Sequence, residues 1–226
     1  MTSVKNRISI GERTFYILNG FFLGIFFVAT LYPLIYLISS SISSPEAVAA
    51  GKVVLFPVGF SLKGYSQVLN NQNVLLGFWN SFVYTVGGTV INVCMTMITA
   101  FVLSRRELIG RSFFSFFFTF TMWFSGGMIP SYLLVQSLGL MNTRWALWLP
   151  VMMSVWNLII TKTYIQTTIP EELYEAVSID GCGYFRYFIT IVIPLSGAII
   201  AVISLFYAIG HWNTFFRALI YLSDRK

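Results

Sequence analysis

The chain has 226 residues, of which 57% are hydrophobic and 10% are charged, whereas a soluble domain carries about 25% charged residues. A chain of this size cannot hide so much apolar surface in a core, so lipid must solvate much of it. The net charge of +6 arises from short clusters between apolar runs, which is typical of loops that orient membrane proteins and argues against nucleic-acid binding. The one histidine, His211, has no carboxylate or thiol cluster beside it in the sequence, so no metal site is expected.

Five segments are apolar over a length close to the roughly 20 residues that a helix needs to cross a bilayer. None shows the two-residue alternation of a barrel strand, and a helix satisfies its own backbone hydrogen bonds in lipid. The expected spans are residues about 15–40, 78–103, 113–135, 145–165 and 192–222. The sequence therefore predicts an all-α membrane protein that forms a single domain over residues 1–226.

The distribution of Lys and Arg predicts the orientation of these spans. With the N-terminus in the cytoplasm, the inner segments hold eight of these residues and the outer segments hold five. The short loop 104–111 contributes three of the eight, and short loops weigh most in this rule. Residues 41–77 then form an outer loop, with a short helix expected near residues 65–69.

The inner loop 166–190 has five charged residues between two apolar spans: Glu171, Glu172, Glu175, Asp180 and Arg186. Thr168 and Glu171 have the spacing of a capping box, which predicts a helix that begins at Thr168. Gly181 is suited to the left-handed conformation that ends a helix. A helix that merely lies on anionic lipid is usually basic, so this acidic helix indicates a protein partner.

This loop resembles the EAA motif of binding-protein-dependent ABC importer permeases. Residues 175–181 have the sequence Glu-Ala-Val-Ser-Ile-Asp-Gly, and residues 191–194 have the sequence Ile-Val-Ile-Pro. Val177 stands where the motif has a third small residue, and Ile193 replaces a Leu. Residues 80–81 and 99–105 resemble the second span of carbohydrate-importing, maltose-type permeases, while 124–130 and 211–216 are similar to a subgroup that imports complex oligosaccharides.

The resemblance covers nearly the whole chain and implies the transmembrane domain of a type I ABC importer in the bacterial cell membrane. In that family two permease subunits, usually different chains, form the translocation path, and an extracytoplasmic solute-binding protein delivers the sugar. The EAA helix of each permease docks on a cytoplasmic ATP-binding subunit. The residues that the resemblance assigns to this coupling are Glu172, Glu175, Ala176, Val177, Asp180 and Gly181.

The chain has no Gly-x4-Gly-Lys-Ser/Thr phosphate-binding loop, so it is not expected to be an enzyme. We expect it to bind no cofactor, with ATP and Mg²⁺ held by the partner subunits. An ion-coupled carrier is the main alternative, but it would require carboxylates within the spans, and the five predicted spans contain no Asp or Glu. A membrane-embedded enzyme would require a reactive cluster, which the sequence does not show.

Arg217 and Asn213 are expected on one face of the last span, four residues apart. Arg217 either extends to the outer surface or contacts the substrate, and the sequence leaves both interpretations open. Together with the net charge, Arg217 suggests an acidic, uronate-containing oligosaccharide. His211 is expected to be a packed side chain, and Gly87-Gly88 and Gly126-Gly127 are expected to be close-packing or kink sites.

The predicted spans leave the positive end of the chain, Arg225 and Lys226, on the outer side. This goes against the rule that Lys and Arg are more frequent on the cytoplasmic side of a membrane protein. The resembled permeases have a sixth span at this point. We therefore expect a further span after residue 226 in the natural protein.

The predicted orientation can be tested with fused reporters. A reporter placed after Gly110 should be active in the cytoplasm, and one placed within residues 50–60 should be active outside, because the positive loop stays on the inner side. Enzymatic reporters specific for each compartment measure this. The reverse pattern would refute both the orientation and a cytoplasmic location for loop 166–190.

Overall fold

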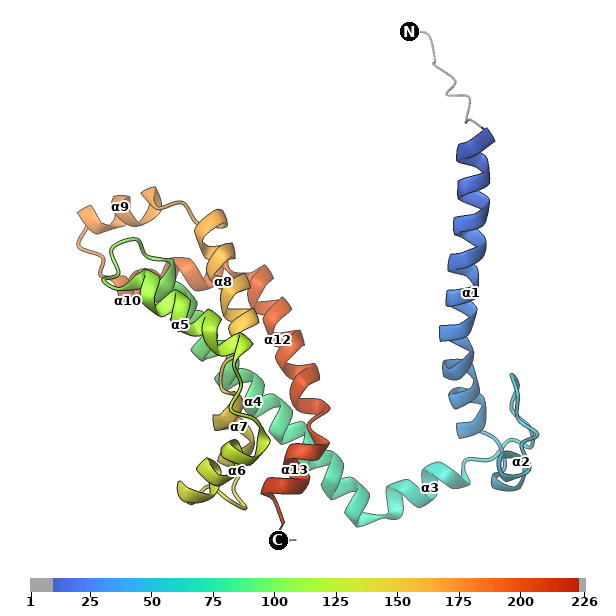
Figure 1. The fold of residues 1–226 in the computed structure, drawn as a ribbon. Coiled ribbons are helices and arrows are strands. Elements are labelled where there is room, and N and C mark those ends of the chain that lie inside the picture. The colour runs from blue at the N-terminus through green and yellow to red at the C-terminus, as the bar shows by residue number, and fades with distance from the viewer. Residues whose placement is uncertain (1–9, 224–226) are drawn as a thin grey trace. The chain divides into compact units, whose positions relative to one another are not determined.

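The computed structural model describes residues 10–223 (Figure 1). Over this range the regular elements are helices, with no strand among them, which confirms the predicted all-α fold. The chain divides into two compact units between Leu76 and Gly77.

The first unit contains α1 (Ile10–Ser41), α2 (Pro45–Ala49) and α3 (Lys63–Asn70). Two serine hydroxyls hold residues 55–58 against the end of α1. Ser39 Oγ donates to the carbonyl of Leu55 at 2.6 Å, and Ser43 Oγ accepts from the N–H of Val58 at 3.0 Å. Helix α3 confirms the short helix predicted near residues 65–69.

Helix α4 (Gln72–Ser104) leads into the second unit. The elements that follow are α5 (Arg111–Trp123), α6 (Met128–Ser137), α7 (Trp145–Trp148), the 3₁₀ turn η1 (Leu149–Val151), α8 (Val155–Thr168), α9 (Glu172–Ile179), α10 (Tyr184–Tyr187), the π-helical turn η2 (Phe188–Val192), α11 (Ile193–Leu195), α12 (Gly197–Trp212) and α13 (Phe215–Tyr221). Within this unit α9 and α10 lie at one end, and α6, α7 and α13 lie at the other (Figure 1).

By length and composition, α1 and α4 can each cross a membrane as single helices. Two further spans are formed if each of two bent pairs counts as one: α5 with α6, and α10–α11 with α12. The structure thus places helices at all five predicted spans but divides three of them. Three of the four interruptions have identifiable causes in the sequence.

The predicted span 113–135 bends by 114° between α5 and α6. Gly127 has a φ of +86°, a conformation that L side chains rarely adopt, and a Cβ built there meets no atom of the described residues within 4 Å. Of the two roles predicted for Gly126-Gly127, the structure therefore favours the kink over close packing.

The predicted span 145–165 is interrupted at residues 152–154. Pro150 occupies η1, and Ser154 begins α8 as its N-cap, with its hydroxyl accepting from the N–H of Asn157. A new helix start inside an apolar segment leaves backbone donors without helical partners, and Ser154 satisfies one of them. The interruption is therefore a defined helix start.

The predicted span 192–222 is divided twice, at Ser196 and at residues 213–214. Pro194 cannot donate a backbone hydrogen bond and crowds the preceding turn, which accounts for the π-helical turn η2 just before it. The axes on either side of Ser196 differ by 80°. The second break separates Asn213 from Arg217, so the expectation that they share one helix face is wrong.

The main core of the second unit lies between α4, α8, α10–η2 and α12. Its fully buried members include Ala100, Ile165, Tyr187, Val192 and Ile203. Each helix contributes at least one of these side chains, so the core joins the four segments over much of their length.

Two adjacent glycines of α4 allow bulky side chains to pack against its backbone. A Cβ on Gly87 would lie 2.7 Å from the ring of Trp148, and one on Gly88 would lie 2.5 Å from the ring of His211. Both distances are shorter than real Cβ contacts allow. This confirms close packing at Gly87-Gly88 and a packed role for His211.

We expect Gly88→Ala to destabilise the protein by roughly 1–3 kcal/mol, the usual cost of overpacking. Gly77→Ala, in the same helix, is the matched control, because no atom in the described range lies within 4 Å of a Cβ there. Ala is the better helix former, so the control should be neutral or slightly stabilising. Thermal unfolding of the purified importer measures both, and equal melting temperatures would contradict the packing.

Candidate functional site

Helix α9 is the centre of the predicted inner loop, but it begins later than the capping box implied. Thr168 is the last residue of α8, and the N-cap of α9 is Glu171, whose side chain makes no capping bond. The capping-box prediction is therefore wrong. The cause is Pro170, which disfavours a helical conformation in the residue before it, and Ile169 is extended.

The end of α9 matches the prediction. Asp180 is the C-cap, and Gly181 has a φ of +77°. The left-handed turn lets the N–H of Cys182 bond to the carbonyl of Val177 at 3.1 Å. The chain thereby reverses sharply out of α9 and into α10.

The two faces of α9 differ. Its outward face is exposed and consists of Glu172, Glu175, Ala176 and Ile179, the last 86% exposed. On its other face Tyr174 and Val177 pack against the main core. The sequence grouped Val177 with the docking residues, whereas the structure places it on the anchored side.

Aromatic side chains hold α9 and α10 against α4. Tyr187 is fully buried, and the ring of Tyr174 lies 5.1 Å from it and 4.5 Å from that of Tyr184. The guanidinium of Arg105 lies 5.0 Å from the ring centre of Phe101 and 5.6 Å from that of Tyr187. These contacts fix loop 166–190 to the C-terminal end of α4.

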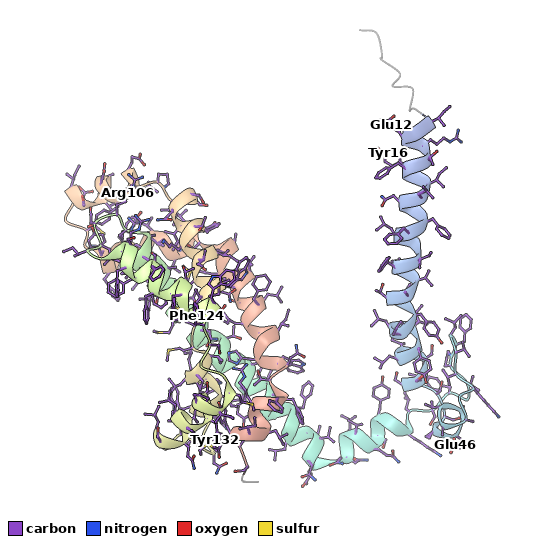
Figure 2. All side chains as sticks on the ribbon, viewed as in Figure 1. Glu12, Tyr16, Glu46, Arg106, Phe124 and Tyr132 are labelled. Carbon is purple, nitrogen blue, oxygen red and sulfur yellow. The ribbon has the colours of Figure 1, made fainter. Side chains whose placement is uncertain are left out.

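Polar contacts link the same loop to residues 104–111. Arg106 pairs with Glu171 at 3.2 Å, near the label in Figure 2, and the hydroxyl of Tyr184 donates to Glu107. Arg106 and Glu171 are 81% and 38% exposed, so their ion pair contributes no more than about 1 kcal/mol. The buried aromatic contacts therefore carry most of the attachment.

Two backbone carbonyls at the end of α4 accept hydrogen bonds from side chains in this region. Arg111 Nε donates to the carbonyl of Leu103 at 3.1 Å, and Gln166 Nε2 donates to that of Ser104 at 3.3 Å.

A groove of about 620 Å³ lies between loop 104–111, the end of α8 and α9. Its charged lining residues are Arg105, Arg106, Arg111, Glu171, Glu172 and Glu175.

A second cavity, of about 570 Å³, lies between α4, η1–α8 and α12–α13. Its lining residues are Asn92, Pro150, Val151, Met153, Ser154, Trp156, Asn157, Phe206, Tyr207, Gly210, His211 and Arg217. Of the two predicted path residues, Arg217 lines this cavity and Asn213 does not. Asn213 is exposed, and its amide donates to the carbonyl of Ile209 at 2.9 Å.

Asn92 and Asn157 stand out in the sequence as amide side chains within apolar spans, whereas Ser154 and Tyr207 do not. Polarity within an apolar run is a usable signal for Asn92, whose amide donates to the carbonyl of Val151 at 2.9 Å. Tyr207 gave no such signal, because tyrosine is common in membrane helices at either interface.

The sequence is 42% identical over 213 residues to the polygalacturonan/rhamnogalacturonan transport system permease protein YtcP of Bacillus subtilis strain 168, covering 94% of this chain and 74% of the relative. It is 41% identical over 212 residues to protein LplC of the same organism, covering 94% and 72%. The chain belongs to the permease family of sugar ABC importers. No family model matches the sequence.

A solved structure of a bacterial ABC transporter involved in the import of the acidic polysaccharide alginate contains a chain similar to the permease. The TM-score is 0.90 at 36% identity, and the match covers 95% of the permease and 76% of that chain. This confirms the ABC importer permease fold. Permeases of this family are non-catalytic membrane subunits, and the permease is likewise embedded in a membrane.

We expect Tyr187→Ala to loosen the inner loop, because removing a large buried aromatic side chain typically costs about 3–5 kcal/mol. Trypsin should then cut at the exposed Arg186 faster than in the wild type. Phe185→Ala is the control, since its ring is 78% exposed. Equal cleavage rates in the two variants would show that Tyr187 does not anchor the loop.

Proposed function

We propose that the permease forms half of the translocation path for an oligosaccharide and is coupled through α9 to ATP hydrolysis on a separate cytoplasmic subunit. The observation that carries this proposal is the two-faced geometry of α9. Its outward side is acidic and exposed, while its other side is bound to the main core through Tyr174 and Val177.

The outward face has the chemistry of a protein-docking surface. Ala176 is small enough to allow close approach, and Ile179 presents an exposed apolar side chain. Glu172 and Glu175 offer negative charge to cationic groups of a partner cleft. Asp180 and Gly181 end the helix, and Val177 positions it from the anchored side.

The attachment of α9 also favours a mechanical role. Helix α9 follows α8 directly, and the contact between Tyr187 and Arg105 binds α10, which follows α9, to the end of α4. A movement of the partner against α9 would therefore displace α4 and α8 together, as rigid-body transport mechanisms require. ATP and Mg²⁺ would be bound by that partner, and the permease would bind neither.

The remaining partners follow from family membership. A second permease subunit, most simply a different chain, would complete the path, and an extracytoplasmic binding protein would deliver the sugar. The inner loop 166–190 and the N-terminus would face the cytoplasm. The names of two similar proteins, one for polygalacturonan or rhamnogalacturonan transport and one for alginate import, support an oligosaccharide as the substrate.

We expect Glu175→Lys to reduce co-purification of the ATP-binding subunit and uptake, since reversing a charge at a docked contact costs on the order of several kcal/mol. Gly181→Asp should lower uptake by straining the left-handed turn. Glu46→Lys, on α2, is a control with the same charge change outside the inner loop. Normal co-purification and uptake in both test variants would show that α9 is only a surface helix and does not dock on the ATP-binding subunit.

A further inference from the structure

The cavity between α4, η1–α8 and α12–α13 lies part-way along α4, a helix long and apolar enough to cross a membrane. Asn92 lies about 18 Å along α4 from Ser104, at about 1.5 Å per residue, and the hydrocarbon core is about 30 Å thick. Two of the helix breaks, at residues 152–154 and 213–214, adjoin the cavity. Interrupted helices near the bilayer midplane are a recurring way to build substrate sites.

Three polar atoms of the described residues that line the cavity are buried without a hydrogen bond, and two of them belong to Arg217 and Asn92. Arg217 Nη2 donates to Thr214 Oγ1 at 3.0 Å, but its Nη1 has no partner in the described range. Asn92 Oδ1 likewise lacks a donor among the described residues. Such atoms are costly in an apolar setting, and a ligand that pairs with them removes the cost.

The third unpaired atom in this region has a different explanation. His211 Nε2 has no hydrogen bond in the part of the chain described, but the ring of His211 is pressed against Gly88. The ring of His211 therefore packs between α12 and α4. The groups left for a ligand are an arginine donor and an amide acceptor.

The charge of the cavity favours an anion. Among the described residues that line it, Arg217 has the one permanent charge, and none is Asp or Glu. A guanidinium matches the planar geometry of a carboxylate, and the bond between them is charge-assisted. The rings of Trp156 and Phe206 supply apolar surface for the C–H faces of a sugar. The volume of about 570 Å³ is within the range of about 300–1,000 Å³ for ligand pockets.

We infer that this cavity binds a carboxylate-bearing sugar unit in transit, with Arg217 pairing with the carboxylate and Asn92 accepting from a sugar hydroxyl. The inference rests on the proposed import function and adds a substrate class and a specificity residue to it. It also selects between the two interpretations of Arg217, substrate contact over extension to the outer surface.

The test uses the complete importer, expressed with its natural partner subunits, and two labelled probes: trigalacturonate and its neutral methyl ester. In Arg217→Gln the ratio of acid to ester uptake should fall about tenfold, the order of one lost charge-assisted hydrogen bond. Arg217→Lys keeps a point charge without the planar geometry and should give an intermediate ratio. Arg144→Gln, at an exposed arginine outside the cavity, should keep the wild-type ratio.

Because the binding protein is identical in all variants, a changed ratio reports on the permease itself. An unchanged ratio in Arg217→Gln, or an equal loss with both probes, would overturn the inference. Wild-type uptake of the ester alone, or of neither probe, would also overturn it. The coupling proposal is judged separately by co-purification of the ATP-binding subunit with Glu175→Lys, which needs no substrate.

Discussion

The hydroxyl of Tyr207 joins three helices inside the second unit. It lies 2.6 Å from Thr96 Oγ1 on α4 and accepts from the N–H of Ser154 at 3.0 Å, where α8 begins. Within a membrane an unpaired polar group costs several kcal/mol, so these bonds exclude most other arrangements of α4, α8 and α12. They also allow α8 to begin inside an apolar segment, and the cavity is bordered by that helix start.

Two of these helices, α4 and α8, connect the cavity with loop 166–190. Helix α4 passes Asn92 at the cavity and ends at Ser104, beside the anchored loop, while α8 begins at Ser154 and ends at Thr168, just before α9. Helices transmit displacement along their length because their internal hydrogen bonds resist compression. In the proposed coupling role, α9 is attached at one end of these two helices and the cavity lies along them, so the two sites are physically contiguous.

Hydropathy and local turn chemistry were sufficient to predict the all-α membrane fold, the acidic helix and its end at Gly181. They could not predict the interruptions, because a broken span is as apolar as a continuous one, and only Pro150, Pro194 and Gly127 mark the breaks. Thr168 was misassigned because a capping box is a short pattern that Pro170 overrides. The inward direction of Val177 depends on where the helix lies against the core, which local sequence patterns do not give. The cavity required tertiary contacts between residues more than a hundred positions apart.

Among the residues that the structure describes, no carboxylate forms an ion pair with Arg217: its Nη2 donates to Thr214, and its Nη1 has no hydrogen bond. A fixed carboxylate beside it would stabilise the fold but would also occupy the donor that the proposed substrate needs. A translocation path must bind its cargo well enough to admit it and weakly enough to release it, a compromise known from channels. A single arginine whose Nη1 has no hydrogen-bond partner among the described residues, near apolar rings, provides an attraction of that intermediate kind. In the proposed role, the energetic cost of leaving Nη1 of Arg217 without a partner is what makes the cavity selective for an acidic sugar without holding it permanently.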